Sequence, residues 1–114
     1  MGEIEAVFDG KEPAALETYR ALTRALNAFG IFVEEAKKNS IHLARKSAFA
    51  GVHPRKAAIL LVIRTKAPID SPRIRKRERV SANRWHNEML LGAPSDIDAE
   101  VLRWLREGYE LSGP

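Results

Sequence analysis

Two histidines and a glutamate are the residues of this chain whose types suit acid–base chemistry or ligand binding. His42 lies in a segment where apolar and polar residues alternate, as they do in a half-buried strand. If Trp85, Met89 and Leu91 of the expected strand 85–91 face the core, His86 and Glu88 face the other side. If these three residues share the outer face of one sheet, with Arg64 beside them, they could bind a small anion or transfer a proton.

The same residues give less support to a metal site or to catalysis than to the binding of a small anion. The two histidines and Glu88 are scattered along the chain and lack the spacing typical of a zinc site, so we predict no metal site and no bound cofactor. The chain has no cysteine, which excludes thiolate ligands and a cysteine nucleophile. No serine lies in the sequence context of a nucleophile elbow. We therefore assign no catalytic residue and expect a binding role rather than an enzyme.

Positive charge is concentrated in the middle of the chain. Residues 37–84 contain fourteen Lys and Arg against two acidic residues, whereas the segments 1–36 and 85–114 each have a net charge of −4. The overall charge of +4 hides this segregation. Clustered positive charge in a small domain is typical of a protein with an anionic partner.

The first functional hypothesis is a binding module for a polyanion such as nucleic acid. Five cations stand within the seven residues 73–79, and arginine suits bidentate contact with phosphate. No aromatic residue lies between them, so stacking on single-stranded bases is not indicated. The candidate contacts are Lys37, Lys38, Arg45, Lys46, Arg73, Arg75, Lys76, Arg77, Arg79 and Arg84.

The simplest interpretation is that the basic segment is only solvated and has no partner. Two further functional hypotheses remain open. In one, the protein is an interaction or self-associating accessory domain, in which the basic segment of one copy meets the acidic terminal helices of another. In the other, the open sheet face around His42, Arg64, His86 and Glu88 binds a small anion or supports an enzymatic reaction. Oligomeric state is left open by the sequence.

Hydrophobic patterning predicts two main helices and about five strands. The first helix begins at Pro13, and the second is expected to be capped by Ser95. Short turns between the first four strands favour an antiparallel meander. A basic loop at about 64–84 precedes the last strand. The strands are expected at 31–33, 40–44, 48–52, 57–63 and 85–91.

We therefore predict a single α+β domain over residues 1–114, with an antiparallel sheet flanked on one face by an N-terminal and a C-terminal helix. Because each helix has one apolar stripe, the two can cover only one face of the sheet, and the other face should be open. The longest apolar run, 57–63, is too short to span a bilayer, and the N-terminal residues lack the pattern of a secretory signal. We expect a cytoplasmic protein with no membrane contact.

Three segments together resemble a known family. They are Lys37–Leu43 continuing into Ala48–Val52, then Arg84–Glu88, and finally Ser95–Tyr109. In their order they resemble the uncharacterised bacterial family called domain of unknown function 5655, over nearly the whole chain. The resemblance implies a small α+β domain and supplies no catalytic residues. The best-matching positions are Lys38, Ile41, Phe49, His86, Trp104 and Leu105.

Overall fold

The computed structural model describes residues 2–113, which form three α-helices, six β-strands and one 3-10 turn. The helices are α1 (Glu3–Val7), α2 (Pro13–Leu26) and α3 (Ala99–Leu111), and the 3-10 turn covers Pro94–Asp96. The strands are β1 (Val33–Ala36), β2 (Ile41–Ala44), β3 (Ala48–Pro54), β4 (Ile59–Thr65), β5 (Lys76–Ser81) and β6 (Arg84–Leu91).

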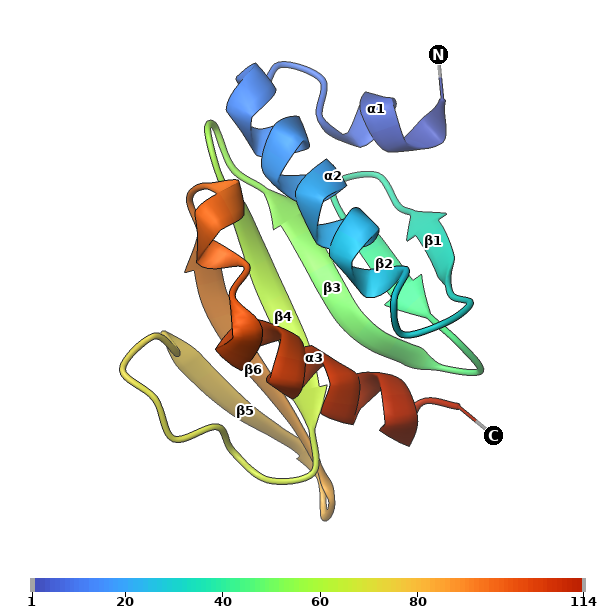
Figure 1. Cartoon of the computed structure of the whole chain (residues 1–114), viewed down its shortest axis with the longest axis vertical. Helices are drawn as coiled ribbons and strands as arrows, with labels where there is room; N and C mark the ends of the chain where they lie inside the picture. The colour runs from blue at the N-terminus through green and yellow to red at the C-terminus, as the bar shows by residue number, and fades with distance from the viewer. Residues whose placement is uncertain (1, 114) are drawn as a thin grey trace.

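All six strands belong to one antiparallel sheet, in the order β1-β2-β3-β4-β6-β5 (Figure 1). The predicted α+β class is confirmed, and so is the meander of the first four strands. The sheet has one strand more than the five expected. β1 also lies slightly later than predicted, at Val33–Ala36 rather than at 31–33.

The additional strand lies inside the segment predicted to be a basic loop. β4 continues to Thr65, β5 occupies Lys76–Ser81, and only residues 66–75 connect the two. The expectation of a loop over the whole of 64–84 is therefore wrong. Every residue of β5 is exposed, so this edge strand has no apolar alternation by which hydrophobic patterning could detect it.

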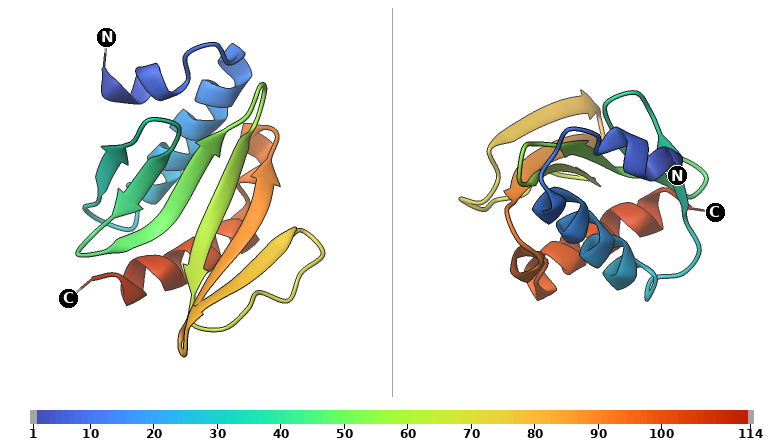
Figure 2. Two further views of the ribbon diagram at one scale, coloured as in Figure 1. Left: turned by 180° about the vertical axis from the view of Figure 1, so that it is seen from behind. Right: turned by 90° about the horizontal axis from the view of Figure 1, so that it is seen from above.

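Both long helices pack on the same face of the sheet, as the view along the sheet in Figure 2 (right) shows. α2 buries Tyr19, Leu22 and Leu26 completely, and α3 does the same with Val101 and Leu105. Facing them are the apolar residues of β2, β3, β4 and β6. The opposite face has no helix over it (Figure 2, left). The prediction of helices on one face is thus confirmed.

A β-bulge at Phe49 lets this large side chain join the core. The register changes from Leu43 opposite Ala50 to Ala44 opposite Ala48, which leaves Phe49 as the extra residue on β3. Phe49 is fully buried and packs edge-on against Tyr109 of α3. Residues 48, 51 and 53 of β3 are consequently left for the open face.

Asn87 attaches the connection between β4 and β5 to the sheet. Its side chain is fully buried and accepts a hydrogen bond from the backbone N–H of Ile69 at 3.0 Å. It also donates to the carbonyl of Ile63 at 3.0 Å and to the hydroxyl of Thr65 at 2.8 Å. Buried amides require such partners, and here they fix residues 66–75 against β6.

Gly108 allows α3 to lie directly on the backbone of the sheet. A Cβ at this position would be 2.6 Å from the carbonyl oxygen of Arg64 and 3.1 Å from that of Phe49. The first distance is shorter than any van der Waals contact, and both atoms belong to strands that cannot easily move. The close approach of α3 to β3 and β4 therefore requires glycine.

Replacing Asn87 by leucine should destabilise the domain by about 3 kcal/mol, because the buried amide of Ile69 and the carbonyl of Ile63 would lose their side-chain partner. Urea denaturation measures this change, and hydrogen exchange should show faster exchange of the Ile69 amide. An unchanged free energy of unfolding would show that the three hydrogen bonds make no net contribution to stability.

Replacing Gly108 by alanine should lower the free energy of unfolding by about 2 kcal/mol, because α3 must move away from β4 to admit the methyl group. The matched control is Glu110→Ala on the same helix, an exposed position where a change within about 0.5 kcal/mol is expected. Equal effects of the two substitutions in thermal unfolding would contradict the close approach.

Candidate functional site

The open face brings the four predicted open-face residues together. Across the middle of the sheet, His42 on β2 lies opposite Gly51, and Gly51 lies opposite Val62. Val62 in turn lies opposite Glu88 on β6. Because directly opposed residues point to the same face, His42 and Glu88 belong to one row on the open side.

A second row runs beside the first. Arg64 on β4 lies opposite His86 on β6, and His86 lies opposite Glu78 on β5. This row is two residues along from the first, so its side chains emerge on the same face. The predicted grouping of His42, Arg64, His86 and Glu88 is therefore what the strand register produces.

These side chains enclose a cavity of about 300 Å³ on the open face. Gly51 lies in the first row, between His42 and Val62, and has no side chain to fill this space. A Cβ added there would meet only Val62 Cβ at 3.8 Å and His53 Nε2 at 3.9 Å, which are ordinary contacts. The charged and titratable residues that line the cavity are His42, His53, Arg64, Glu78, Arg84, His86 and Glu88.

Arg64 is held in place and is incompletely hydrogen-bonded. Its Nη1 donates to the hydroxyl of Ser47 at 2.8 Å. Its Nε is buried and has no hydrogen-bond partner within residues 2–113. Burial, and then the nearby positive charge of Arg84, lower the pKa of Arg64 from its ordinary value.

His86 and Arg84 are in direct contact. Nε of Arg84 donates a hydrogen bond to Nε2 of His86 at 3.3 Å, so His86 carries its proton on Nδ1 and is neutral. Burial lowers the pKa of His86, and Arg84 and Arg64 lower it further, against the opposing effect of Glu78. The two arginines and His86 thus form one positive corner of the cavity.

The other end of the cavity contains His42, His53 and Glu88. Burial lowers the pKa of His53, and the charge of Arg55 adds to this effect while Glu88 opposes it. His53 and Glu78 are not among the residues predicted for the site. The strand expected at 48–52 excluded His53, but β3 extends to Pro54, so His53 shares its face with Gly51.

Arg73, Arg77 and Arg45, which belong to the ten cations predicted to contact a polyanion, each make more than one contact within the fold. Arg73 forms ion pairs with Asp98 and Glu100 at 3.0 and 3.1 Å, and its Nη2 donates to the carbonyl of Asp96 at 2.9 Å. Arg77 donates to the carbonyls of residues 69 and 71 at 2.7 and 2.9 Å. Arg45 lies 4.1 Å above the Tyr109 ring and donates to its carbonyl.

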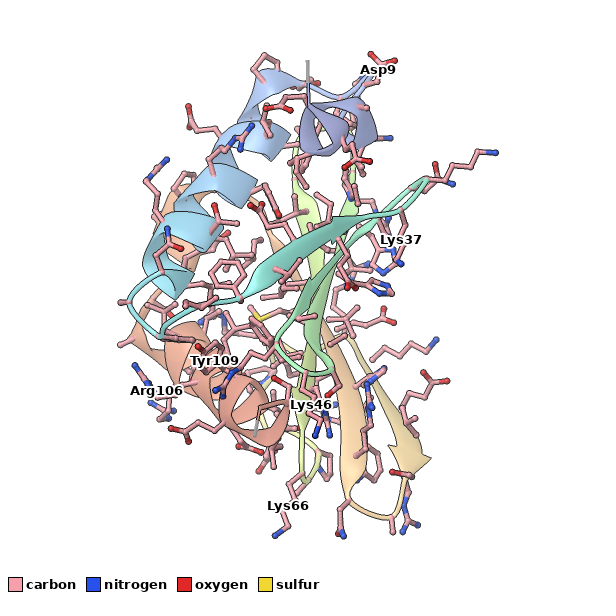
Figure 3. All side chains as sticks on the ribbon, turned by 90° about the vertical axis from the view of Figure 1, so that its right-hand side faces the viewer. Asp9, Lys37, Lys46, Lys66, Arg106 and Tyr109 are labelled. Atoms are coloured by element: carbon pink, nitrogen blue, oxygen red, sulfur yellow. The ribbon has the colours of Figure 1, made fainter. Side chains whose placement is uncertain are left out.

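The remaining cations of that set do not gather into one patch. Lys37 and Lys38 lie at the turn between β1 and β2, and Lys46 follows the opposite end of β2 (Figure 3). Arg75, Lys76 and Arg79 lie before or on β5, and the strand order places β3, β4 and β6 between β2 and β5. Arg84 differs from the rest because it lines the cavity.

Within residues 2–113, no three side chains of His, Cys, Asp or Glu are arranged to hold a metal ion. The described helices also include none with the length and apolar character needed to cross a bilayer.

These features define a small α+β domain with a six-stranded antiparallel sheet, covered by helices on one face and hollowed on the other. The chain matches the family Domain of unknown function (DUF5655) over residues 4–112 and therefore belongs to it. The resemblance expected from the sequence is confirmed. Searches of curated proteins and of solved structures gave no significant match.

The pKa of His86 should respond to its charged neighbours in opposite directions. Arg84→Gln should raise it, because a positive charge and a hydrogen bond to the neutral imidazole are both removed, whereas Glu78→Gln should lower it. NMR titration of the imidazole signals measures both shifts. Lys38→Gln, in the distant β1–β2 turn, is the control and should leave the titration unchanged.

Proposed function

We propose that this domain is a binding module for an anionic ligand, which it holds in the cavity of the open sheet face. The observation that carries the proposal is the convergence of two arginines and three histidines, from four different strands, on one cavity. Pockets that combine a few charged groups with an apolar floor are typical ligand sites. Here the floor is formed around Gly51 and Val62.

The two arginines of the cavity lack carboxylate partners within residues 2–113, which supports an anionic ligand. Neither Arg64 nor Arg84 forms an ion pair within the part of the chain that the structure describes, although Arg73 does so elsewhere. A guanidinium without a carboxylate partner in a partly buried site favours a bound anion. The cavity lining contains imidazoles and carboxylates but no hydroxyl, thiol or amine side chain, and its two arginines suit holding an anion, so we favour binding over catalysis.

A polyanion such as nucleic acid is the second candidate, and β5 is the observation that favours it. Arg75, Lys76 and Arg79 are exposed on or beside this edge strand and form no ion pair within residues 2–113. Self-association through opposite charges has less support, because Arg73 already meets the acidic start of α3 within the same chain. We place the protein in the cytoplasm because its sequence has no cysteine.

Filling the cavity should abolish small-anion binding. In the wild type, titration with phosphate, sulfate or citrate, followed by NMR, should give saturable shifts of the amides of His42, Gly51 and His86 for at least one anion. Gly51→Leu should weaken this binding by at least about tenfold, because the added side chain would project from the first row into the cavity. Gly51→Ala is the matched control for folding, since its methyl group makes only ordinary contacts.

The charge-reversal variant Arg75→Glu, Lys76→Glu, Arg79→Glu separates the two candidates. It should leave small-anion binding intact, whereas it should abolish binding of a single-stranded oligonucleotide if β5 contacts a polyanion. Arg77 is spared because its side chain supports residues 69 and 71. No saturable shift with any of the three anions, or equal binding by Gly51→Leu, would refute the cavity as the site.

A further inference from the structure

We infer that the ligand of the open-face cavity is a phosphomonoester, with its phosphate between Arg64, Arg84 and His86 and with one proton taken up by the protein on binding. The inference rests on the function proposed above and names the ligand class of the same site.

The positive corner has the geometry of a phosphate site. Arg64 and His86 are direct neighbours across β4 and β6, and Arg84 reaches His86 from two residues away on β6. Each arginine uses only one N–H in a hydrogen bond within residues 2–113, Nη1 for Arg64 and Nε for Arg84. The remaining Nη N–H groups of the two arginines are available to phosphate oxygens.

His86 supplies a proton-dependent third contact. The charged groups that face it are Arg64 from β4, Glu78 from β5 and Arg84 from its own strand. With the site empty, the two arginines disfavour a third positive charge. A phosphate dianion between the arginines reverses that balance, so the imidazole gains a proton and donates it as a hydrogen bond.

The charge of the ligand distinguishes a phosphomonoester from a carboxylate or a sulfate ester. A phosphomonoester has a second pKa of about 6 and is close to a dianion above neutral pH. Arg64, Arg84 and a protonated His86 carry three positive charges and Glu78 one negative charge, so their sum of +2 matches a dianion. A monoanionic carboxylate or sulfate ester would leave one positive charge uncompensated.

The other half of the cavity defines what the phosphate is attached to. A water molecule takes about 30 Å³ of the liquid, so a cavity of about 300 Å³ holds a phosphate and a body of several further atoms. That body would lie over Gly51, beside His42, His53 and Glu88. The carboxylate of Glu88 accepts hydrogen bonds, which suits hydroxyl groups such as those of a sugar phosphate or a nucleotide.

Calorimetric titration with ribose 5-phosphate at pH 7.5, in two buffers of different ionisation enthalpy, tests the inference directly. We expect saturable binding with net uptake of up to one proton. Arg84→Gln should lose at least about tenfold in affinity. His86→Gln should retain weaker binding but lose most of the proton uptake. Lys11→Gln, at an exposed position between α1 and α2, should behave as the wild type, and ribose without phosphate should not bind.

Further ligands identify the source of the phosphate and separate the two proposals. Adenosine 5′-monophosphate and an oligonucleotide with or without a 5′-phosphate distinguish a free metabolite from a nucleic-acid end. Binding of citrate in preference to every phosphomonoester, with loss in Gly51→Leu, would overturn the phosphomonoester and keep the anion site. Phosphomonoester binding without proton uptake would overturn the role of His86, and binding unaffected by Gly51→Leu would refute both proposals.

Discussion

The packing of α2 and α3 on a single face of the sheet is the constraint on which the remaining features depend. Gly108 brings α3 against the backbone of β3 and β4, and the bulge at Phe49 turns a large aromatic side chain toward Tyr109. The apolar half of every central strand is thereby used on this side. The other half of each strand faces water, so charged residues are tolerated there. The cavity therefore lies on the face of the sheet that does not form the core.

Alternation within strands made much of this arrangement predictable. His42, His86 and Glu88 were assigned to one outer face because the apolar residues of their strands were expected to face the core, and the observed register places them there. Alternation does not, however, say which strands are neighbours. The juxtaposition of Arg64 with His86 depends on the pairing of β4 with β6, which skips over β5. Only the assembled sheet shows it.

Other features lay beyond hydrophobic patterning for identifiable reasons. β5 is fully exposed and is held at the edge by pairing with β6, while Asn87 anchors the preceding connection by hydrogen bonds that leave no trace in a polarity pattern. The start of the last helix is a similar case. Ser95 was expected to cap it, but residues 94–96 form a 3-10 turn, and Asp98 caps α3 by accepting from the Val101 amide.

The basic middle of the chain turns out to serve three different purposes. Arg45, Arg73 and Arg77 bind carbonyls, carboxylates or an aromatic ring of the same chain, so their charges stabilise the fold. Lys37, Lys38, Lys76 and Arg79 stay in water at separate places on the sheet. Arg64 and Arg84 are partly buried, form no ion pair within residues 2–113 and, unlike Arg45, line the cavity. The net charge along the sequence cannot separate these groups, because they differ in what each cationic side chain contacts in the folded protein. A pair of like charges kept together on a hollowed face is unfavourable for folding in itself, and a bound anion is what would offset that cost.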